Sequence, residues 1–142
     1  MTTQPAQYVL DASALIAFLT AEEGGILVAR LISQARKGEA ELHLATINLF
    51  EVYYDHLKRG ASQEEANEFL DALYSLPLSI AGRIDRSWLE KAATLKVTYK
   101  VSVADSFGLA LAQQLQAPLV SADHHEFDAV EATGAVQFYW IR

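Results

Sequence analysis

The stretch from Tyr8 to Leu19 constrains the fold most, because it joins a short apolar run directly to an acid and then to a helical apolar pattern. Residues 8–10 favour a buried strand, and Asp11 stands where that strand would leave the sheet. In an open parallel sheet, ligands bind outside the carboxyl ends of the strands. The position of Asp11 therefore indicates chemistry rather than packing.

Strand and helix patterns alternate along the rest of the chain. Strand patterns lie at 42–45, 78–80, 119–120 and 137–141, and helical patterns lie at 26–37, 46–59, 62–76, 86–99 and 103–116. We expect Thr46 to cap the helix that it begins, Ser87 and Glu90 to open the helix over 86–99, and a polar segment to cross 121–129. This alternation predicts an α/β fold with a mostly parallel sheet and helices on both faces.

Length, composition and charge exclude several classes of protein. A chain of 142 residues predicts one domain, over 1–142, and a hydrophobic content of 51% excludes a disordered chain. No apolar run approaches the roughly 18 residues that span a bilayer, and residues 1–7 have no signal-peptide pattern, so we expect a cytoplasmic protein without a membrane segment. A net charge of −7 argues against a broad basic face for nucleic acid, but it permits a local basic rim.

Four acids occupy comparable places in the expected fold. Asp11 follows the first strand, and Glu51 lies on the helix after the second strand. Asp105 lies in the first turn of an apolar helix, and Asp123 follows the strand over 119–120. Because the carboxyl ends of parallel strands share one edge of the sheet, these acids are expected to converge.

Converging carboxylates repel one another, and none of the four has a lysine or arginine close enough in sequence to neutralise it. A divalent cation would remove this conflict. The chain has no cysteine, and a site made of oxygen ligands suits Mg²⁺ or Mn²⁺. Such an ion serves the hydrolysis of phosphate esters, so we expect this metal and no other cofactor.

Each acid also has a structural interpretation. Asp11, Asp105 and Asp123 are common types of helix cap or turn residue, and Glu51 taken alone resembles a solvated helix residue. The adjacent histidines His124 and His125 are typical of a polar surface turn. Four acids are nevertheless expected near the same ends of strands and helices, and this arrangement favours a functional site over four separate structural roles.

Four segments carry a resemblance to a known family. They are Val9–Leu15 (VLDASAL), Thr46–Tyr53 (TINLFEVY), Val103–Ala110 (VADSFGLA) and Leu119–Phe127 (LVSADHHEF). In this order and spacing, the chain resembles the PIN-domain family and, within it, the VapC-like toxin ribonucleases. The resemblance implies a three-layer α/β/α sandwich, an endoribonuclease that depends on Mg²⁺ or Mn²⁺, a homodimer, and a small antitoxin protein as partner.

The resemblance also implies roles for individual residues. It assigns the metal site and catalysis to Asp11, Glu51, Asp105 and Asp123, and it assigns polar support to Ser13, Thr46, Asn48 and Ser121. Ser121 stands where threonine is commoner in the family, and Ser106 stands where a small apolar residue is commoner. Asp128 is a further acid near the last motif.

Our hypothesis is therefore a metal-dependent endoribonuclease whose RNA substrate is cut by in-line attack of water. Asp11, Asp105 and Asp123 would hold the metal, and Glu51 would be a further ligand or would orient the water. Two alternatives stay open. One is a phosphatase with Asp11 as covalent nucleophile, which usually needs a second aspartate where this chain has Ser13. The other is a binding or scaffold domain without catalysis.

Overall fold

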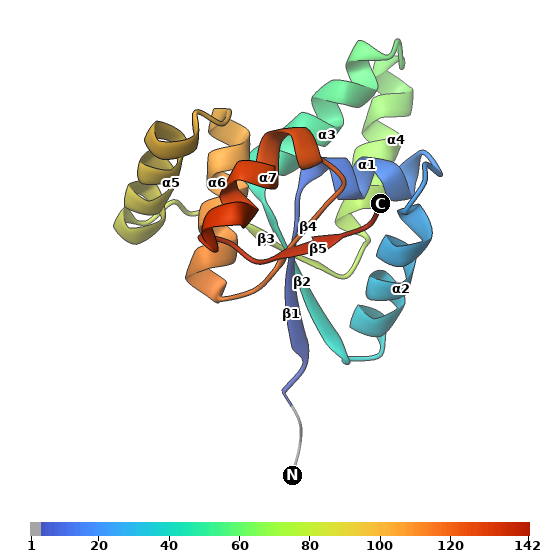
Figure 1. Cartoon of the computed structure of the whole chain (residues 1–142). Helices are drawn as coiled ribbons and strands as arrows, with labels where there is room; N and C mark the ends of the chain where they lie inside the picture. The colour runs from blue at the N-terminus through green and yellow to red at the C-terminus, as the bar shows by residue number, and fades with distance from the viewer. Residues whose placement is uncertain (1–3) are drawn as a thin grey trace.

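The computed structural model describes residues 4–142 and contains a five-stranded sheet at its centre (Figure 1). The strand order is β3-β2-β1-β4-β5, and every pair of neighbouring strands is parallel. The strands are β1 (Ala6–Leu10), β2 (Ala40–Ala45), β3 (Leu78–Ala81), β4 (Leu119–Ser121) and β5 (Phe138–Trp140). The predicted parallel α/β fold is confirmed.

Helices cover both faces of this sheet. They are α1 (Ala12–Leu19), α2 (Gly25–Arg36), α3 (Thr46–Lys58), α4 (Gln63–Tyr74), α5 (Arg86–Tyr99), α6 (Val103–Leu115) and α7 (His124–Thr133). Helices α1 to α4 pack on one face, and α5 to α7 pack on the other (Figure 1). The result is the three-layer α/β/α sandwich that the sequence motifs imply.

Strand β1 shows why both faces must be covered. Successive side chains of a strand point to opposite faces, and both Val9 and Leu10 are fully buried. Val9 packs with α5, α6 and α7, whereas Leu10 packs with α1, α2 and α3. A strand that is apolar on both sides is stable only between two helical layers.

The direction in which strands are added to the sheet reverses at β1. The chain proceeds from β1 to β2 and β3 on one side, and then crosses to β4 and β5 on the other. Leu10 pairs with Val120, and the amide of Asp11 donates a 3.1 Å hydrogen bond to the carbonyl of Val120. Asp11 therefore lies at the point where strand order reverses, which is where open α/β sheets bind ligands.

Three local expectations were wrong. The segment expected to be polar and non-helical contains the start of α7, with Phe127 and Val130 buried against the core. Helix α3 begins at Thr46 after an N-cap at Ala45 that makes no side-chain bond. Helix α5 is capped by Asp85, whose carboxylate accepts a hydrogen bond from the amide of Trp88, instead of by the expected Ser87 pattern.

No helix within residues 4–142 combines the length and the apolar character that crossing a membrane requires.

Candidate active site

Asp11 lies at the carboxyl end of β1 and is only 3% exposed. The hydroxyls of Ser13 and Ser121 donate hydrogen bonds of 2.8 Å to its Oδ1 and 2.6 Å to its Oδ2, respectively. The amide of Ala14 donates a further bond of 2.9 Å to Oδ1, so Asp11 also caps α1. These bonds use three of the roughly four acceptor positions of a carboxylate. One position on Oδ2 is left for a ligand.

Backbone groups set the direction of the two serine hydroxyls. The amide of Ala122 donates to Oγ of Ser13 and the amide of Asp123 donates to Oγ of Ser121, both at 3.0 Å. A hydroxyl has a single proton, and each oxygen already accepts from a backbone amide. Each serine can therefore donate to Asp11, and the ends of β1 and β4 are joined through this carboxylate.

Glu51 lies one turn into α3 and is oriented by a buried amide. Asn48 is 0% exposed, and its Nδ2 donates hydrogen bonds of 3.0 Å to Oε1 of Glu51 and 3.3 Å to the carbonyl of Ala104. A Cβ atom on Gly108 would lie 3.0 Å from Oδ1 of Asn48, so glycine permits the close approach of α6 to α3. Asn48 thus fixes Glu51 relative to the start of α6.

Asp105 projects from the first turn of α6. The hydroxyl of Ser102, not the carboxylate of Asp105, caps this helix and accepts a 3.1 Å bond from the amide of Asp105. The capping interpretation of Asp105 is therefore wrong. Its carboxylate remains available for the site.

Asp123 and Glu126 come from the turn between β4 and α7 and from the first turn of α7. Asp123 is the N-cap of α7, and its Oδ1 accepts a 3.2 Å bond from the amide of Glu126. Glu126 contributes a small repulsion to the raised pKa of Asp105, and it is an acid near the site that sequence reasoning did not select. The sequence could have indicated Glu126, because it stands three residues after Asp123. This spacing places the two side chains close together only if residues 124–133 are recognised as a helix.

The electrostatics show that these acids share one environment. Burial raises the pKa of Asp11 to about 6, although its hydrogen bonds act in the opposite direction and repulsion by Asp123 adds to the increase. Burial also raises the pKa of Asp105 to about 7, followed by repulsion from Glu51 and smaller contributions from Asp11 and Glu126. Burial raises the pKa of Glu51 as well. Without a cation, burial and mutual repulsion make the ionised form of these carboxylates less stable than it would be in water.

The other candidates lie elsewhere. The hydroxyl of Thr46 donates a 3.0 Å bond to the carbonyl of Ala81, so it joins α3 to β3. His124 stacks on Trp140 with ring centroids 3.7 Å apart, and its Nδ1 lies 3.0 Å from Oδ1 of Asp128. The exposed carboxylate of Asp128 therefore contacts His124 of the same helix and not the acidic site.

The donor set of this edge fits a divalent cation. Its side chains offer carboxylate and hydroxyl oxygens, the ligands that Mg²⁺ and Mn²⁺ prefer. Within residues 4–142, no ion pair joins Asp11, Glu51, Asp105 or Asp123 to a lysine or arginine. Among the same residues, no three histidine or acidic side chains are close enough to form a finished coordination shell. The carboxylates act on one another electrostatically but would have to draw together around an ion.

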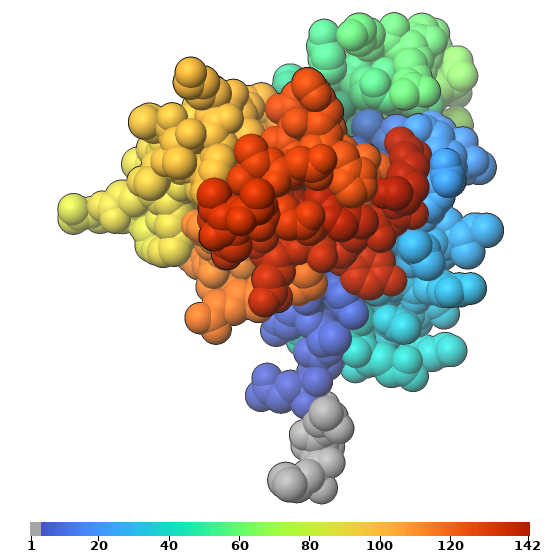
Figure 2. Space-filling view, viewed as in Figure 1, coloured from blue at the N-terminus to red at the C-terminus, as the bar shows by residue number. Residues whose placement is uncertain are grey.

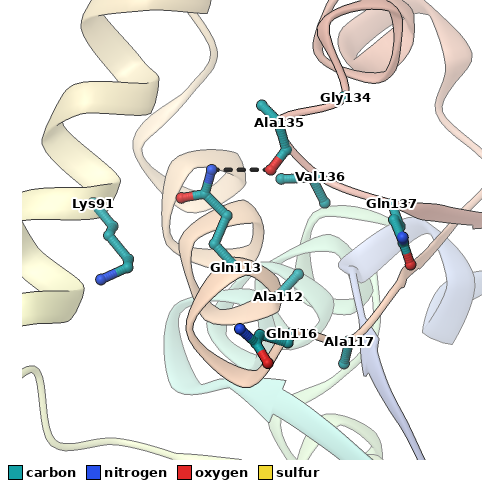
Figure 3. Close-up of a pocket in the computed structure, with 9 residues that line it drawn as sticks. All are labelled: Lys91, Ala112, Gln113, Gln116, Ala117, Gly134, Ala135, Val136 and Gln137. Atoms are coloured by element: carbon teal, nitrogen blue, oxygen red, sulfur yellow. Dashed lines mark hydrogen bonds between the residues drawn. The ribbon is translucent and has the colours of Figure 1, made fainter.

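A cavity of about 590 Å³ lies at the opposite edge of the sheet (Figure 3). It is lined by the end of α6 and by the segment that leads into β5, where Nε2 of Gln113 donates a 3.0 Å hydrogen bond to the carbonyl of Ala135. Lys91 is the ionisable residue of this lining, which contains no carboxylate side chain. The cavity is therefore separate from the acidic edge.

The fold and the site define an α/β/α sandwich with an acidic centre at the carboxyl edge of its parallel sheet. A family model described as PIN domain matches residues 8–132. Because this match spans most of the chain, the protein belongs to the PIN-domain family.

Individual relatives agree with this assignment. Ribonuclease VapC3 of Pyrobaculum aerophilum is 31% identical over 119 residues, which cover 81% of this chain and 88% of that protein. The DNA-bound VapBC structure from Salmonella typhimurium matches with a TM-score of 0.73 at 12% identity, covering 96% of this chain and 99% of that one. VapBC2 from Rickettsia felis, bound to a DNA fragment from its promoter, matches with a TM-score of 0.72 at 16% identity, covering 94% and 98%. These two likenesses concern the fold.

Proposed function

We propose that this protein is a metal-dependent endoribonuclease and the toxin of a toxin–antitoxin pair. The observation that supports the proposal is the electrostatic repulsion among acids from four distant segments near the carboxyl end of β1, where Ser13 and Ser121 hold Asp11 by hydrogen bonds. The similarity to Ribonuclease VapC3 supports RNA as the substrate.

Asp11, Asp105 and Asp123 would hold one or two Mg²⁺ or Mn²⁺ ions, with Glu51 as a further ligand. When bound, such an ion lowers the pKa of water and neutralises charge that develops on the phosphate. The protein contributes the positions of the carboxylates. Asp11 presents its one open acceptor position on Oδ2, because Ser13 and Ala14 occupy Oδ1.

Glu51 has a second role at the same place. Its Oε1 accepts the hydrogen bond from Asn48, so Oε2 is the oxygen left to face the site. At this position Oε2 can accept a proton of the attacking water and so orient the water toward phosphorus. Asn48, Ser13 and Ser121 then act by holding Glu51 and Asp11 in place, and Thr46 acts more remotely through β3.

The arrangement of Asp11 disfavours the phosphatase alternative. Both oxygens of Asp11 accept hydrogen bonds from hydroxyl or amide groups, which lowers the nucleophilicity of the carboxylate even though one acceptor position on Oδ2 stays open. Ser13 stands in the place of the second aspartate and donates its proton to Asp11.

Partners follow from the same family assignment. We propose a small antitoxin as protein partner, because the structural neighbours are solved as VapBC and toxin–antitoxin complexes. We also propose a single-domain, cytoplasmic protein that forms a homodimer. Light scattering of the purified protein, alone and with its co-expressed antitoxin, tests both assemblies.

The test of catalysis is cleavage of defined RNAs in Mg²⁺ or Mn²⁺ by wild type and two variants, Asp11→Asn and Asp105→Asn. Both variants should lose cleavage at least 100-fold while circular dichroism shows an intact fold. Asp128→Asn is the matched control, because Asp128 is exposed and pairs with His124, and it should cleave like wild type. Full activity of either site variant, or of wild type in excess chelator, would reject the proposal. Trapping of phosphate on Asp11 would favour the phosphatase instead.

A further inference from the structure

Helix α3 exposes an aromatic pair beside the acidic site. Phe50 is 64% exposed and Tyr54 is 55% exposed, although both are large apolar side chains. Their rings are stacked, with centroids 6.1 Å apart and an interplanar angle of 17°. Such a pair presents flat aromatic surface to solvent without burying it against the rest of the chain.

The aromatic pair adjoins Glu51 on the same helix. Residues three and four apart are neighbours on a helix surface, so Tyr54 lies beside Glu51 and Phe50 lies beside Tyr54. Glu51 accepts a hydrogen bond from Asn48 of the same helix, and its carboxylate repels Asp105 of α6. The aromatic pair is therefore adjacent to the acidic site on the surface of α3.

A positive charge continues the same face. Lys58 is exposed, stands seven residues after Glu51, and shares its side of the helix. The rise of 1.5 Å per residue separates the two positions by about 10 Å along the helix axis. In this order the face carries a carboxylate, an aromatic pair and an ammonium group, and no ion pair occupies Lys58 among residues 4–142.

Taking the proposed function as its basis, we propose that this face of α3 binds single-stranded RNA next to the scissile phosphate. An unpaired base would stack on Phe50 and Tyr54, and Lys58 would contact a phosphate further along the strand. Unstacked bases of RNA are commonly held by aromatic side chains in this way, and stacking accepts every base.

Two observations favour RNA over a protein partner on this face. The exposed apolar side chains nearest Glu51 are stacked rings, and the patch is continuous with the site where the RNA phosphate would be cut. Hairpin α3–α4 also projects from the body of the molecule (Figures 1 and 2).

The test measures binding of a single-stranded RNA that carries 2-aminopurine, with Asp11→Asn as the non-cleaving background and with Mg²⁺ present. Adding Phe50→Leu and Tyr54→Leu keeps apolar bulk but removes the rings, and it should weaken binding about 5- to 100-fold and abolish fluorescence quenching by stacking. Tyr74→Leu removes a ring that is 61% exposed at the far end of α4, next to the start of β3, so it is the matched control and should bind like the background. Lys58→Gln should reduce the slope of log affinity against log salt by about 0.7.

Unchanged RNA affinity in the double leucine variant overturns the proposal, and so does an equal loss in Tyr74→Leu. If the double variant keeps RNA affinity but changes the oligomeric state or antitoxin binding, the face is a protein interface and the proposal is also overturned. Cleavage by the wild type is measured in parallel. If the wild type cleaves RNA and the double variant binds RNA normally, only the proposed RNA-binding face of α3 is rejected. If the wild type does not cleave RNA, the proposed function is rejected.

Discussion

The side-chain amide of Asn48 donates a 3.0 Å hydrogen bond to Oε1 of Glu51, while its own Oδ1 has no partner among the described residues. This orientation of the amide is the only consistent one. Both Glu51 and the carbonyl of Ala104 are acceptors, so reversing the amide would place an oxygen against two oxygens. A buried acceptor without a partner is costly, which suggests that holding Glu51 outweighs this cost.

The first prediction concerns the donor of this hydrogen bond. Asn48→Asp replaces the amide with an oxygen that faces Glu51 and Ala104, and it should lower the free energy of unfolding by about 2–3 kcal/mol. Urea denaturation measures the change. Asn67→Asp on α4 makes the same substitution at an exposed position and should change stability by less than about 0.5 kcal/mol. Equal stability of the two variants would contradict the role of Asn48.

The second prediction concerns the glycine that faces Asn48. A Cβ atom introduced by Gly108→Ala would lie 3.0 Å from Oδ1 of Asn48, and the buried amide has little room to move. We expect a loss of about 1–3 kcal/mol in the free energy of unfolding, together with a lower kcat for RNA cleavage and an unchanged KM. A stability loss without any change in kcat would show that the contact matters for packing alone.

The third prediction concerns the hydroxyl of Ser121. Ser121→Ala leaves Oδ2 of Asp11 and the amide of Asp123 without their partner, and Ser121 is fully buried. The free energy of unfolding should fall by about 1–3 kcal/mol, and the pKa of Asp11 should rise further because a bond that lowers it is lost. Ser121→Thr keeps the hydroxyl and should preserve both quantities. Thermal unfolding and carboxyl titration by NMR provide the measurements.

The sequence predicted the order of strands and helices because its apolar periods are long and its breaks are marked by glycine and proline. It also predicted which acids follow the strands, since that depends only on where an apolar run ends. It did not predict helix α7, because only Phe127 and Val130 of its apolar positions are buried and the helix opens with charged and polar residues. The local sequence could not show that packing of these two side chains against the core would be enough to stabilise the helix.

The same limit explains the choice between Glu126 and Asp128. Glu126 lies within the last motif and Asp128 directly follows it. When a helix has not been recognised, the sequence does not show which side of that helix each residue occupies. Two residues correspond to about 200° of rotation on a helix, so the two side chains point to opposite sides. Glu126 acts on Asp105 whereas Asp128 contacts His124.

The fourth prediction concerns pH, and it follows from the raised pKa of Asp11. An unfolded aspartate has a pKa of about 3.9, so between that value and about 6 the folded protein holds a proton that the unfolded chain has released. The folded state is therefore favoured at low pH, and this contribution is lost as the pH rises through about 6. For a group that is 3% exposed, the difference corresponds to about 3 kcal/mol.

Asp11→Asn removes this titrating group, so the variant should lose less stability than wild type between pH 4 and pH 8 when both are unfolded by urea in chelator. Asp128→Asn should follow wild type, because Asp128 lies outside the acidic site. Adding Mg²⁺ at pH 8 should stabilise wild type more than Asp11→Asn, since an ion that binds only the folded state shifts the equilibrium by mass action. If wild type and Asp11→Asn showed the same pH dependence, burial of Asp11 would not be the origin of the strain at this edge, and the case for a cation there would lose its electrostatic basis.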